Sequence, residues 1–364
     1  MENANMPFSS IAVLGLGKVG HLAADLLVDS GFAVTGVDAR PNSLTVKCVA
    51  ADLANEDGLT KLLAPFEAVL SCLPYALNKH IATAAHALGI HYFDLTEDVG
   101  TTTHIRKLSE TSKGLMAPQC GLAPGFVGIV GAGLVKRFDR VRSLRLRVGA
   151  LPQHPTGLLG YAFNWSPEGV VNEYLNDCEV IEEGVRKNIS AMEWIETIYV
   201  DGTKLEAFTT SGGLGTMCET YSGSVANLDY KTMRYPGHVD LMNFFFHELL
   251  MRERRSLAGE ILTNAKPPVD DDVVYIHVSA EGFRNGRLDR QEFVRAYHPI
   301  DLAGRTRTAI AWTTSASAVA VIEMVRNGIL PQQGFLKQEE VPLAAFLETR
   351  TGRYFSARTS ANAR

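Results

Sequence analysis

A glycine-rich turn near the start of the sequence limits the possible fold more than any other feature. Gly15, Gly17 and Gly20 form a GxGxxG pattern that follows the apolar run Ile11–Leu14 and opens a helical pattern over Val19–Asp29. In this context the first glycine permits a tight turn, the second lets a phosphate approach the backbone, and the third lets helix and strand pack closely. The pattern predicts a dinucleotide-binding turn at the N-terminus of a helix, and a purely structural glycine turn is the alternative.

Two charged residues after the second expected strand bear on which dinucleotide binds. Asp38 follows the turn at about the 20-residue spacing at which an acid accepts the ribose hydroxyls of NAD and repels a 2′-phosphate. The guanidinium of Arg40 would attract the same phosphate, so NAD is favoured and NADP stays possible. Lys18 and Val19 lie inside the turn. Asp52 follows the third expected strand and is a candidate for the adenine edge or a solvated loop acid.

Residues 10–120 alternate between short apolar runs and segments with helical apolar spacing. This alternation predicts an α/β, doubly wound parallel sheet of the Rossmann type, covered by helices on both faces. Cys72, Leu73 and Pro74 end the fourth expected strand, at the edge that faces the cofactor in such sheets. We expect strands at Ile11–Leu14, Ala33–Val37, Ser43–Ala50, Ala68–Ser71, His91–Leu95 and Leu115–Ala117, and helices at Val19–Asp29, Glu56–Leu63, Asn78–Leu88, Ile105–Thr111 and Val127–Val135.

From about Ser143 the sequence becomes rich in β-formers, which predicts a C-terminal α+β domain on an antiparallel or mixed sheet. Helical spacing over Ala316–Asn327 predicts a helix near residues 315–345 that completes the first domain. The expected domains are 1–120 for cofactor binding and 121–314 for substrate binding and dimerisation. Strands are expected at Leu144–Leu151, Trp194–Tyr199, Val273–Ala280, Phe293–Tyr297 and Thr308–Thr313, and helices at Glu168–Leu175 and His238–Arg254.

Composition argues against several classes of protein. The 364 residues carry 35 Lys+Arg against 40 Asp+Glu, a net charge of −5, whereas a nucleic-acid binder normally presents a basic face. No stretch approaches the ~20 apolar residues of a membrane span. The five cysteines form no CxxC pair, so neither a disulfide framework nor a metal site is predicted, and a reduced cytoplasm fits best. We expect a small-molecule substrate and a homodimer, the commonest symmetric assembly.

Three acids, Asp94, Glu97 and Asp98, cluster at the end of the fifth expected strand. Ligands of open α/β sheets bind at this edge. Asp94 or Glu97 is therefore a candidate to hold an ammonium group or to accept a proton. The alternative for this segment is a helix cap made by Thr96 or Asp98.

Several short motifs give the sequence a specific resemblance. After the glycine turn come CLP at 72–74, YFDLTED at 92–98, CGLAPGF at 120–126 and TMRYPGH at 232–238. In this order they resemble the saccharopine dehydrogenase-like family, with Met233 replacing the usual leucine of the last motif. The resemblance covers the chain up to about residue 250 and is strongest to the lysine 6-dehydrogenases. It implies NAD-linked oxidation of a carbon that bears nitrogen, with L-lysine converted at C6 to 2-aminoadipate semialdehyde or cyclic Δ1-piperideine-6-carboxylate.

The same resemblance draws attention to candidate substrate residues in the second domain. Arg234 has a planar fork suited to a carboxylate, with a structural salt bridge as the alternative. His238 is a candidate proton acceptor near neutral pH or a polar core residue. Glu173 is a candidate partner for an ammonium group. Other candidates to line the pocket, with structural roles as the alternative, are Tyr161, Trp165, Ser166 and Thr210.

Two other functions are compatible with these motifs. A saccharopine or carboxynorspermidine-type reductase would bind a substrate with more carboxylates and would need further arginines, for which Arg142, Arg145 and Arg147 are available. A non-catalytic NAD-sensing protein would use the nucleotide turn without turnover.

Overall fold

The computed structural model describes residues 8–42, 45–55 and 58–356, and these divide into two compact units. Unit 1 contains the described residues up to Ile129 together with those from Ala311 onward, and unit 2 contains Val130–Ile310. In the described part of the chain, no helix is both long enough and apolar enough to span a membrane.

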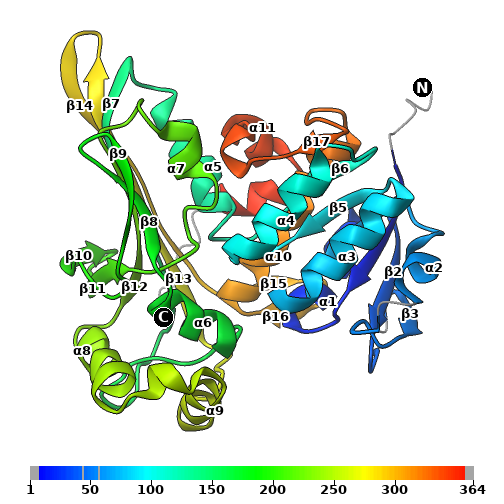
Figure 1. Cartoon of the computed structure of the whole chain (residues 1–364), viewed down its shortest axis with the longest axis horizontal. Coiled ribbons are helices and arrows are strands. Elements are labelled where there is room, and N and C mark those ends of the chain that lie inside the picture. Colours follow the sequence, from blue (N-terminus) through cyan, green and yellow to red (C-terminus); the bar gives the residue numbers. More distant parts are fainter. Residues whose placement is uncertain (1–7, 43–44, 56–57, 357–364) are drawn as a thin grey trace. The chain divides into compact units, whose positions relative to one another are not determined.

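The described residues of unit 1 form a seven-stranded sheet in which every pair of neighbouring strands is parallel (Figure 1). The strand order is β17-β6-β5-β4-β1-β2-β3. β2 and β3 thus lie on one side of β1, and the later strands lie on the other. The predicted Rossmann-type sheet is therefore confirmed. Its strands are β1 (Ser10–Leu14), β2 (Ala33–Asp38), β3 (Lys47–Ala50), β4 (Ala68–Ser71), β5 (His91–Asp94), β6 (Leu115–Ala117) and β17 (Gly334–Phe335).

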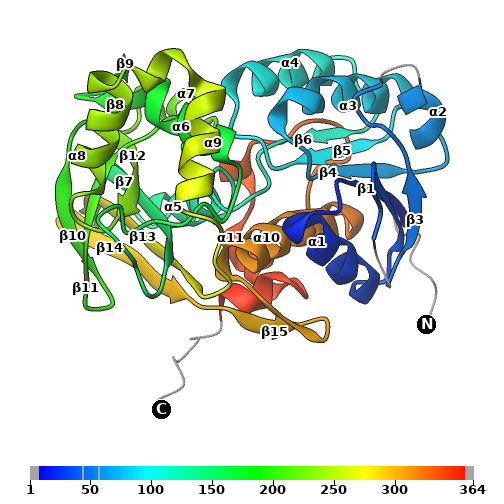
Figure 2. The same cartoon turned by 90° about the horizontal axis from the view of Figure 1, so that it is seen from below.

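Helices cover both faces of this sheet. Figure 2 shows α2, α3 and α4 on one face and α1 and α10 on the other. The Ser315 hydroxyl of α10 donates to the Val19 carbonyl at 2.9 Å, which ties α10 to the first turn of α1. The helices of unit 1 are α1 (Lys18–Asp29), α2 (Leu59–Leu63), α3 (Tyr75–Leu88), α4 (Val99–Ser109), α10 (Ala309–Arg326) and α11 (Leu343–Glu348). The helix α5 (Phe126–Val135) begins in unit 1 and ends in unit 2.

The strand predicted at Thr308–Thr313 is wrong, because these residues begin α10. The Asp272 carboxylate accepts hydrogen bonds from the backbone N–H groups of Ala309 at 2.6 Å and Ile310 at 2.9 Å. A cap of this kind satisfies N–H groups that the first turn of a helix leaves unpaired. This cap favours a helix over the strand that the branched and aromatic side chains at 310–314 would otherwise favour.

Unit 2 is built on a mixed sheet with the order β10-β11-β12-β7-β13-β14, and β8 pairs with β12 and β9 off this path (Figure 1). The pair β12·β7 is parallel and the other pairs are antiparallel, which confirms the predicted α+β character. The strands are β7 (Arg140–Pro152), β8 (Cys178–Glu182), β9 (Val185–Ile189), β10 (Glu196–Val200), β11 (Thr203–Thr209), β12 (Asn227–Arg234), β13 (Asp272–Arg284) and β14 (Arg287–Tyr297), with a separate hairpin of β15 (Ile300–Leu302) and β16 (Arg305–Arg307).

The single helix predicted at His238–Arg254 is also wrong. The helix α8 (His238–Asn243) widens into a π-helical turn over Phe244–Glu248 and then ends, because Leu250 takes a left-handed φ of 56°. A short 3-10 turn precedes the next helix. The helices of unit 2 are α6 (Pro167–Leu175), α7 (Met217–Tyr221), α8 (His238–Asn243) and α9 (Arg255–Ala265).

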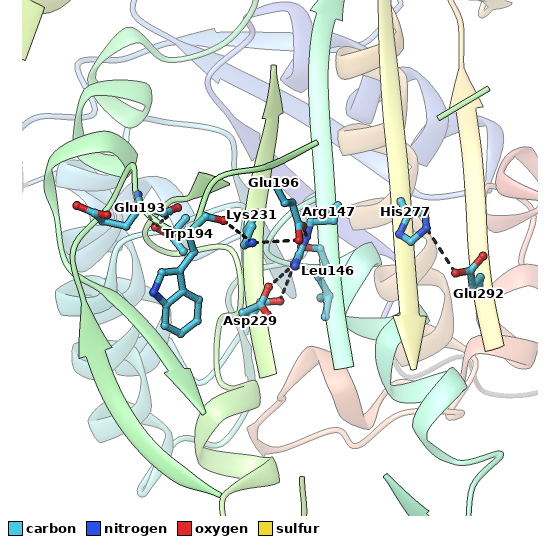
Figure 3. A network of polar contacts seen from close by, with 10 residues as sticks. Leu146, Arg147, Glu193, Trp194, Glu196, Asp229, Lys231, His277 and Glu292 are labelled. Carbon is cyan, nitrogen blue, oxygen red and sulfur yellow. Dashed lines mark hydrogen bonds and ion pairs between the residues drawn. The ribbon is translucent and has the colours of Figure 1, made fainter. Parts of the chain in front are cut away.

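A buried ion network fastens the segment before β10 to one face of this sheet (Figure 3). Arg147 of β7 is only 2% exposed and pairs with Glu196 and Asp229. Lys231 of β12 pairs with Glu196 at 3.2 Å and donates to the Trp194 carbonyl at 2.6 Å. Because side chains alternate along a strand, Lys231 points to the face opposite Arg234. The charge of Arg147 is thus taken by two carboxylates of its own unit.

Replacing Arg147 with alanine is expected to destabilise the fold strongly. Asp229, which is 13% exposed, would lose its cation, and Glu196, which is 33% exposed, would keep only Lys231; losing a hydrogen bond between charged groups costs about 1.5–3 kcal/mol. Urea unfolding measures the change. The matched control is Arg142→Ala, since Arg142 is 56% exposed and its pair with Glu281 is worth less than about 1 kcal/mol. Equal losses in the two variants would contradict the prediction.

Candidate functional site

The turn from β1 into α1 has the geometry expected of a dinucleotide-binding loop. Gly15 takes a φ of 85°, which side chains rarely adopt. A Cβ placed on Gly20 would lie 1.8 Å from the Gly15 carbonyl oxygen, so only glycine fits there. A Cβ on Gly17 would meet no atom within 4 Å, and no side chain caps the helix that starts at Lys18. The helix start therefore leaves room for an anion at its N-terminus.

This geometry predicts different outcomes for two alanine substitutions in the turn. Gly20→Ala should lower stability by about 1–3 kcal/mol, the usual cost of overpacking, and disrupt the turn. Gly17→Ala should leave the melting temperature unchanged but weaken dinucleotide binding by about tenfold or more, because the methyl group would occupy the space of the pyrophosphate. Thermal unfolding and titration with NADH and NADPH measure both effects. Unchanged binding by Gly17→Ala would contradict an approach of the cofactor at this point.

Asp38, at the end of β2, holds the turn in place. Its carboxylate accepts hydrogen bonds from the backbone N–H of Leu16 at 2.7 Å and of Arg40 at 2.9 Å. The bond from Arg40 contributes most to keeping the pKa of Asp38 below its usual value, so the group is charged at neutral pH. Each carboxylate oxygen has a further lone pair that can accept a ribose hydroxyl. The Arg40 side chain is exposed beside it.

The CLP segment after β4 lies against the same turn. A Cβ on Gly15 would lie 3.0 Å from the Leu73 side chain and 3.1 Å from the Cys72 carbonyl oxygen, and Pro74 precedes α3. Burial raises the pKa of the Cys72 thiol to about 12, and the charge of Asp94 adds to the shift. Cys72 is therefore a protonated thiol at neutral pH, as expected of a packing residue.

A cavity of about 630 Å³ lies at the edge of the sheet between β2, β3 and α2. Val37, Val49 and Leu59 are among the apolar residues that line it, and Asp52 is part of its wall. The Asp52 carboxylate also accepts a hydrogen bond from the backbone N–H of Ala54 at 3.0 Å. The residue predicted for the adenine edge thus borders a cavity with an apolar lining.

Asp94, the last residue of β5, is fully buried and organises the carboxyl edge of the sheet. It accepts hydrogen bonds from the Tyr92 hydroxyl at 2.7 Å and from the backbone N–H groups of Thr96 and Gln119, each at 3.0 Å. Burial raises the pKa of Asp94 to about 6, against the effect of these bonds. Three hydrogen-bond donors therefore engage the Asp94 carboxylate, which the sequence also suggests as a proton acceptor.

Glu97 is partly exposed, as Asp98 is, but its pKa lies near neutrality. Burial raises the pKa of Glu97 to about 7, with further contributions from the negative charges of Asp94 and Asp98. Asp98 caps α4 by accepting a hydrogen bond from the Thr101 N–H at 2.6 Å. Within this acidic segment, Glu97 is thus the group whose pKa suits proton exchange at neutral pH.

In unit 2 a second cluster surrounds Arg234, at the end of β12. This side chain is 2% exposed, and Nε donates to the Tyr174 hydroxyl at 2.8 Å. Nη1 donates to the Thr232 hydroxyl at 2.5 Å and the Met233 carbonyl at 2.9 Å, and the guanidinium lies 4.6 Å from the Tyr161 ring centre. No carboxylate of a described residue lies within ion-pair distance of Arg234, although the negative charge of Glu173 is near enough to help raise the pKa of Arg234, after the larger contributions of Tyr174 and Tyr161. A buried guanidinium with this surrounding is suited to bind an anion.

Two hydroxyl groups of unit 2 are buried, that of Tyr161 beside Arg234 and that of Thr210 in the loop after β11. The Thr210 hydroxyl makes no hydrogen bond with another described residue, and the Tyr161 hydroxyl has only the Trp165 side chain beside it, in a geometry too poor for a regular hydrogen bond. Glu173 is 7% exposed, and its charge adds to the burial that raises the pKa of Tyr161. The Ser211 N–H donates to the Glu173 carbonyl at 3.0 Å, which ties the loop of Thr210 to α6. Buried polar atoms without partners are rare and fit a site completed by a ligand.

Other residues expected at this site hold the structure around it. Ser166 is exposed and caps α6 by accepting a hydrogen bond from the Gly169 N–H at 3.1 Å, while Trp165 packs on the apolar core that contains Tyr161. Glu206 of β11 also shapes this region, a role that its place in the sequence does not reveal. Its carboxylate accepts hydrogen bonds from the N–H groups of Gly237 and Val239, which fixes the turn after β12.

His238 is buried, with both ring nitrogens in hydrogen bonds. Nδ1 lies 2.9 Å from the Leu159 carbonyl oxygen and Nε2 lies 3.0 Å from the Tyr174 hydroxyl. Burial, aided by the charge of Arg234, lowers the pKa of His238 to about 3. The imidazole is therefore neutral at physiological pH, and its contacts give no support to the proton-acceptor role considered from the sequence.

Comparison with known families identifies the relatives of the chain. Residues 11–117 match the family model described as saccharopine dehydrogenase NADP binding domain, and residues 121–351 match that of the saccharopine dehydrogenase C-terminal domain. The chain belongs to the saccharopine dehydrogenase family. The family resemblance of the motifs is thus confirmed, and unit 1 carries the nicotinamide dinucleotide-binding domain of this family.

Individual relatives in this family are distant. Saccharopine dehydrogenase [NADP(+), L-glutamate-forming] of Schizosaccharomyces pombe is 24% identical over 213 residues, which are 52% of this chain and 45% of that protein. Mitochondrial alpha-aminoadipic semialdehyde synthase of Rattus norvegicus is 23% identical over 205 residues, 52% of this chain and 22% of that protein. The chain thus matches less than half the length of either relative.

A solved structure shares the fold over nearly the whole chain. Apo saccharopine dehydrogenase (L-Glu forming) from Saccharomyces cerevisiae superposes with a TM-score of 0.69 at 15% identity, covering 91% of this chain and 94% of that one. At this identity the likeness concerns the fold alone.

Proposed function

We propose that the protein is a nicotinamide-dependent oxidoreductase that oxidises a CH–NH2 or CH–NH group of an amino acid, with L-lysine as substrate. The observation that carries the proposal is Arg234, a buried guanidinium with no carboxylate partner among the described residues. Burying a charge without a partner is costly, so a substrate carboxylate is the natural completion of the site. Membership of the saccharopine dehydrogenase family supports the reaction class.

The surroundings of Arg234 suit the two charges of a free amino acid. In the proposal Arg234 binds the α-carboxylate and Glu173 binds the α-ammonium, while the Tyr161 and Thr210 hydroxyls supply further hydrogen bonds. A substrate with several carboxylates, such as saccharopine, would need further arginines. Arg147 is already paired with Glu196 and Asp229, which favours a substrate with one carboxylate.

The chemistry at the amine needs a proton acceptor and a hydride acceptor. We assign proton acceptance from the substrate ammonium to Glu97, because its pKa of about 7 suits exchange at neutral pH. A nicotinamide held at the β1–α1 turn would supply the hydride acceptor for C6. Asp94 positions the loop that carries Glu97 through its bonds to Thr96 and Gln119. Water adds to the imine product and ammonia leaves to give 2-aminoadipate semialdehyde, or the α-amine attacks C6 and ammonia leaves to give Δ1-piperideine-6-carboxylate.

We further propose NAD as the preferred cofactor, although the matching family model is named for NADP. The charged carboxylate of Asp38 would repel a 2′-phosphate, whereas Arg40 is exposed and would attract one. Asp38→Asn is expected to raise the ratio of kcat/KM with NADP to that with NAD by about tenfold, which is about 1.4 kcal/mol. A wild-type preference for NADP that Arg40→Ala abolishes would overturn the assignment.

The direct test follows the reduced cofactor while the protein is incubated with NAD or NADP and single substrates. Turnover of L-lysine supports the proposal. Turnover of saccharopine or carboxynorspermidine without turnover of lysine would overturn the substrate and favour the reductase alternative. Tight dinucleotide binding without turnover of any amine would favour the NAD-sensing alternative. Light scattering after gel filtration tests the homodimer, which we also propose.

A further inference from the structure

We propose that His238 is a neutral positioning residue that fixes the Tyr174 hydroxyl, which in turn fixes the plane of the Arg234 guanidinium. This inference rests on the proposed function, in which Arg234 binds the substrate carboxylate. The three side chains come from different elements of unit 2, since Tyr174 lies on α6, Arg234 ends β12 and His238 begins α8. Each is no more than 2% exposed.

The direction of every hydrogen bond in this chain of contacts follows from the groups at its two ends. The Leu159 carbonyl can only accept, so Nδ1 of His238 donates to it and carries the ring proton. Nε2 of the neutral ring then accepts from the Tyr174 hydroxyl at 3.0 Å. Nε of Arg234 can only donate, so it donates to the Tyr174 oxygen at 2.8 Å. The Tyr174 hydroxyl therefore has one defined orientation.

The surroundings of His238 keep its ring neutral and in place. The Arg234 cation is close enough to disfavour a second charge on the ring, and burial acts in the same direction. Aromatic rings enclose the imidazole, with edge contacts to Tyr161 at 5.3 Å and Tyr174 at 5.8 Å and a stacked contact to Phe208 at 6.3 Å between ring centres. The ring has little freedom to turn, so its acceptor nitrogen stays directed at Tyr174.

These contacts leave one nitrogen of Arg234, Nη2, available to a ligand. Nε is held by Tyr174, and Nη1 is held by Thr232 and Met233. Nη2 makes no hydrogen bond with another described residue. The bonds from Nε and Nη1 therefore leave Nη2 for the substrate carboxylate and fix its direction. Because the guanidinium is planar and rigid, holding Nε and Nη1 fixes the direction in which the N–H groups of Nη2 point.

Two substitutions at position 238 separate the acceptor function from the rest of the side chain. His238→Asn keeps an amide near Nδ1 that can bond to the Leu159 carbonyl, but it is too short to accept from Tyr174. His238→Gln places its amide oxygen near Nε2 and restores an acceptor. Tyr174→Phe removes the hydroxyl and keeps the ring. Tyr174→Phe thereby removes a hydrogen bond to the charged Arg234, and the loss of such a bond corresponds to about 10–100-fold in affinity.

The experiment measures kcat and KM for L-lysine and, independently of turnover, the Kd of L-lysine by calorimetry on the full chain with saturating NADH. Arg234→Ala is the reference for loss of the carboxylate contact. We expect His238→Asn and Tyr174→Phe to raise KM and Kd by about tenfold or more. In both, kcat should change less than threefold. His238→Gln should restore KM and Kd to within about threefold of wild type.

Each other outcome has a defined meaning. If Arg234→Ala binds lysine as well as wild type, the proposed function fails at its central contact. If Arg234→Ala loses binding but His238→Asn and Tyr174→Phe keep it, the positioning role is overturned and the proposed function stands. A collapse of kcat in both His238 variants, with loss of a limb of the pH profile, would make His238 a base and overturn the proposal. Similar losses of melting temperature in all variants, with KM unchanged, would show that His238 and Tyr174 only stabilise the fold, and the proposal would be overturned.

Discussion

Replacing Arg234 with alanine is expected to lower kcat/KM for L-lysine by about 10²–10³-fold. The guanidinium is buried and lacks a carboxylate partner among the described residues, so the variant would leave the substrate carboxylate without its cation. Removing one partner of a buried, hydrogen-bonded charge pair costs roughly 2–5 kcal/mol, and each 1.4 kcal/mol is a factor of ten. Steady-state kinetics with varied lysine measure the loss, which should appear mainly in KM.

Two companion variants separate this effect from damage to the fold. Arg234→Lys keeps the charge but lacks the planar fork that bonds to Tyr174, so its kcat/KM should fall between wild type and the alanine variant. Arg142→Ala removes an exposed arginine of the same sheet and should retain wild-type kinetics. Dinucleotide affinity should be unchanged in all three. An Arg234→Ala enzyme with wild-type KM for lysine would refute the carboxylate role.

Local patterns were sufficient to predict the cofactor half of the fold. The turn from β1 to α1 depends on residues that are neighbours in sequence, and β4 and β6 begin and end where their apolar runs do. The start of α10 was missed because the group that caps it, Asp272, lies on a strand far from it in the sequence. The end of α8 was missed because the apolar residues continue beyond the point where Leu250 leaves the helical conformation.

The site divides in the same way between residue type and residue surroundings. The type of side chain was enough to single out Arg234 as a carboxylate ligand candidate and Glu173 as an ammonium ligand candidate. Distinguishing Asp94 from Glu97 required knowing which carboxylate accepts bonds from Tyr92 and Gln119. Partners separated by many residues likewise determine the state of His238, so spacing within the RYPGH motif could not reveal it.

Removing the carboxylate of Glu97 is expected to slow the reaction and change its pH dependence. Glu97→Gln should lower kcat at neutral pH by about 10²–10⁴-fold, the usual contribution of a general base. In the wild type, kcat/KM should rise as pH increases through about 7, because Glu97 loses its proton there and only the carboxylate can accept one. In the variant this limb should vanish, and residual activity should rise toward the pKa of the free amine, about 10.4, where the substrate needs no base.

Asp98→Asn is the matched control, since asparagine also caps helices well and the lost negative charge should lower the pKa of Glu97. Its acid limb should therefore move to lower pH with the plateau unchanged, whereas an unaltered pH profile in Glu97→Gln would assign the proton to another group.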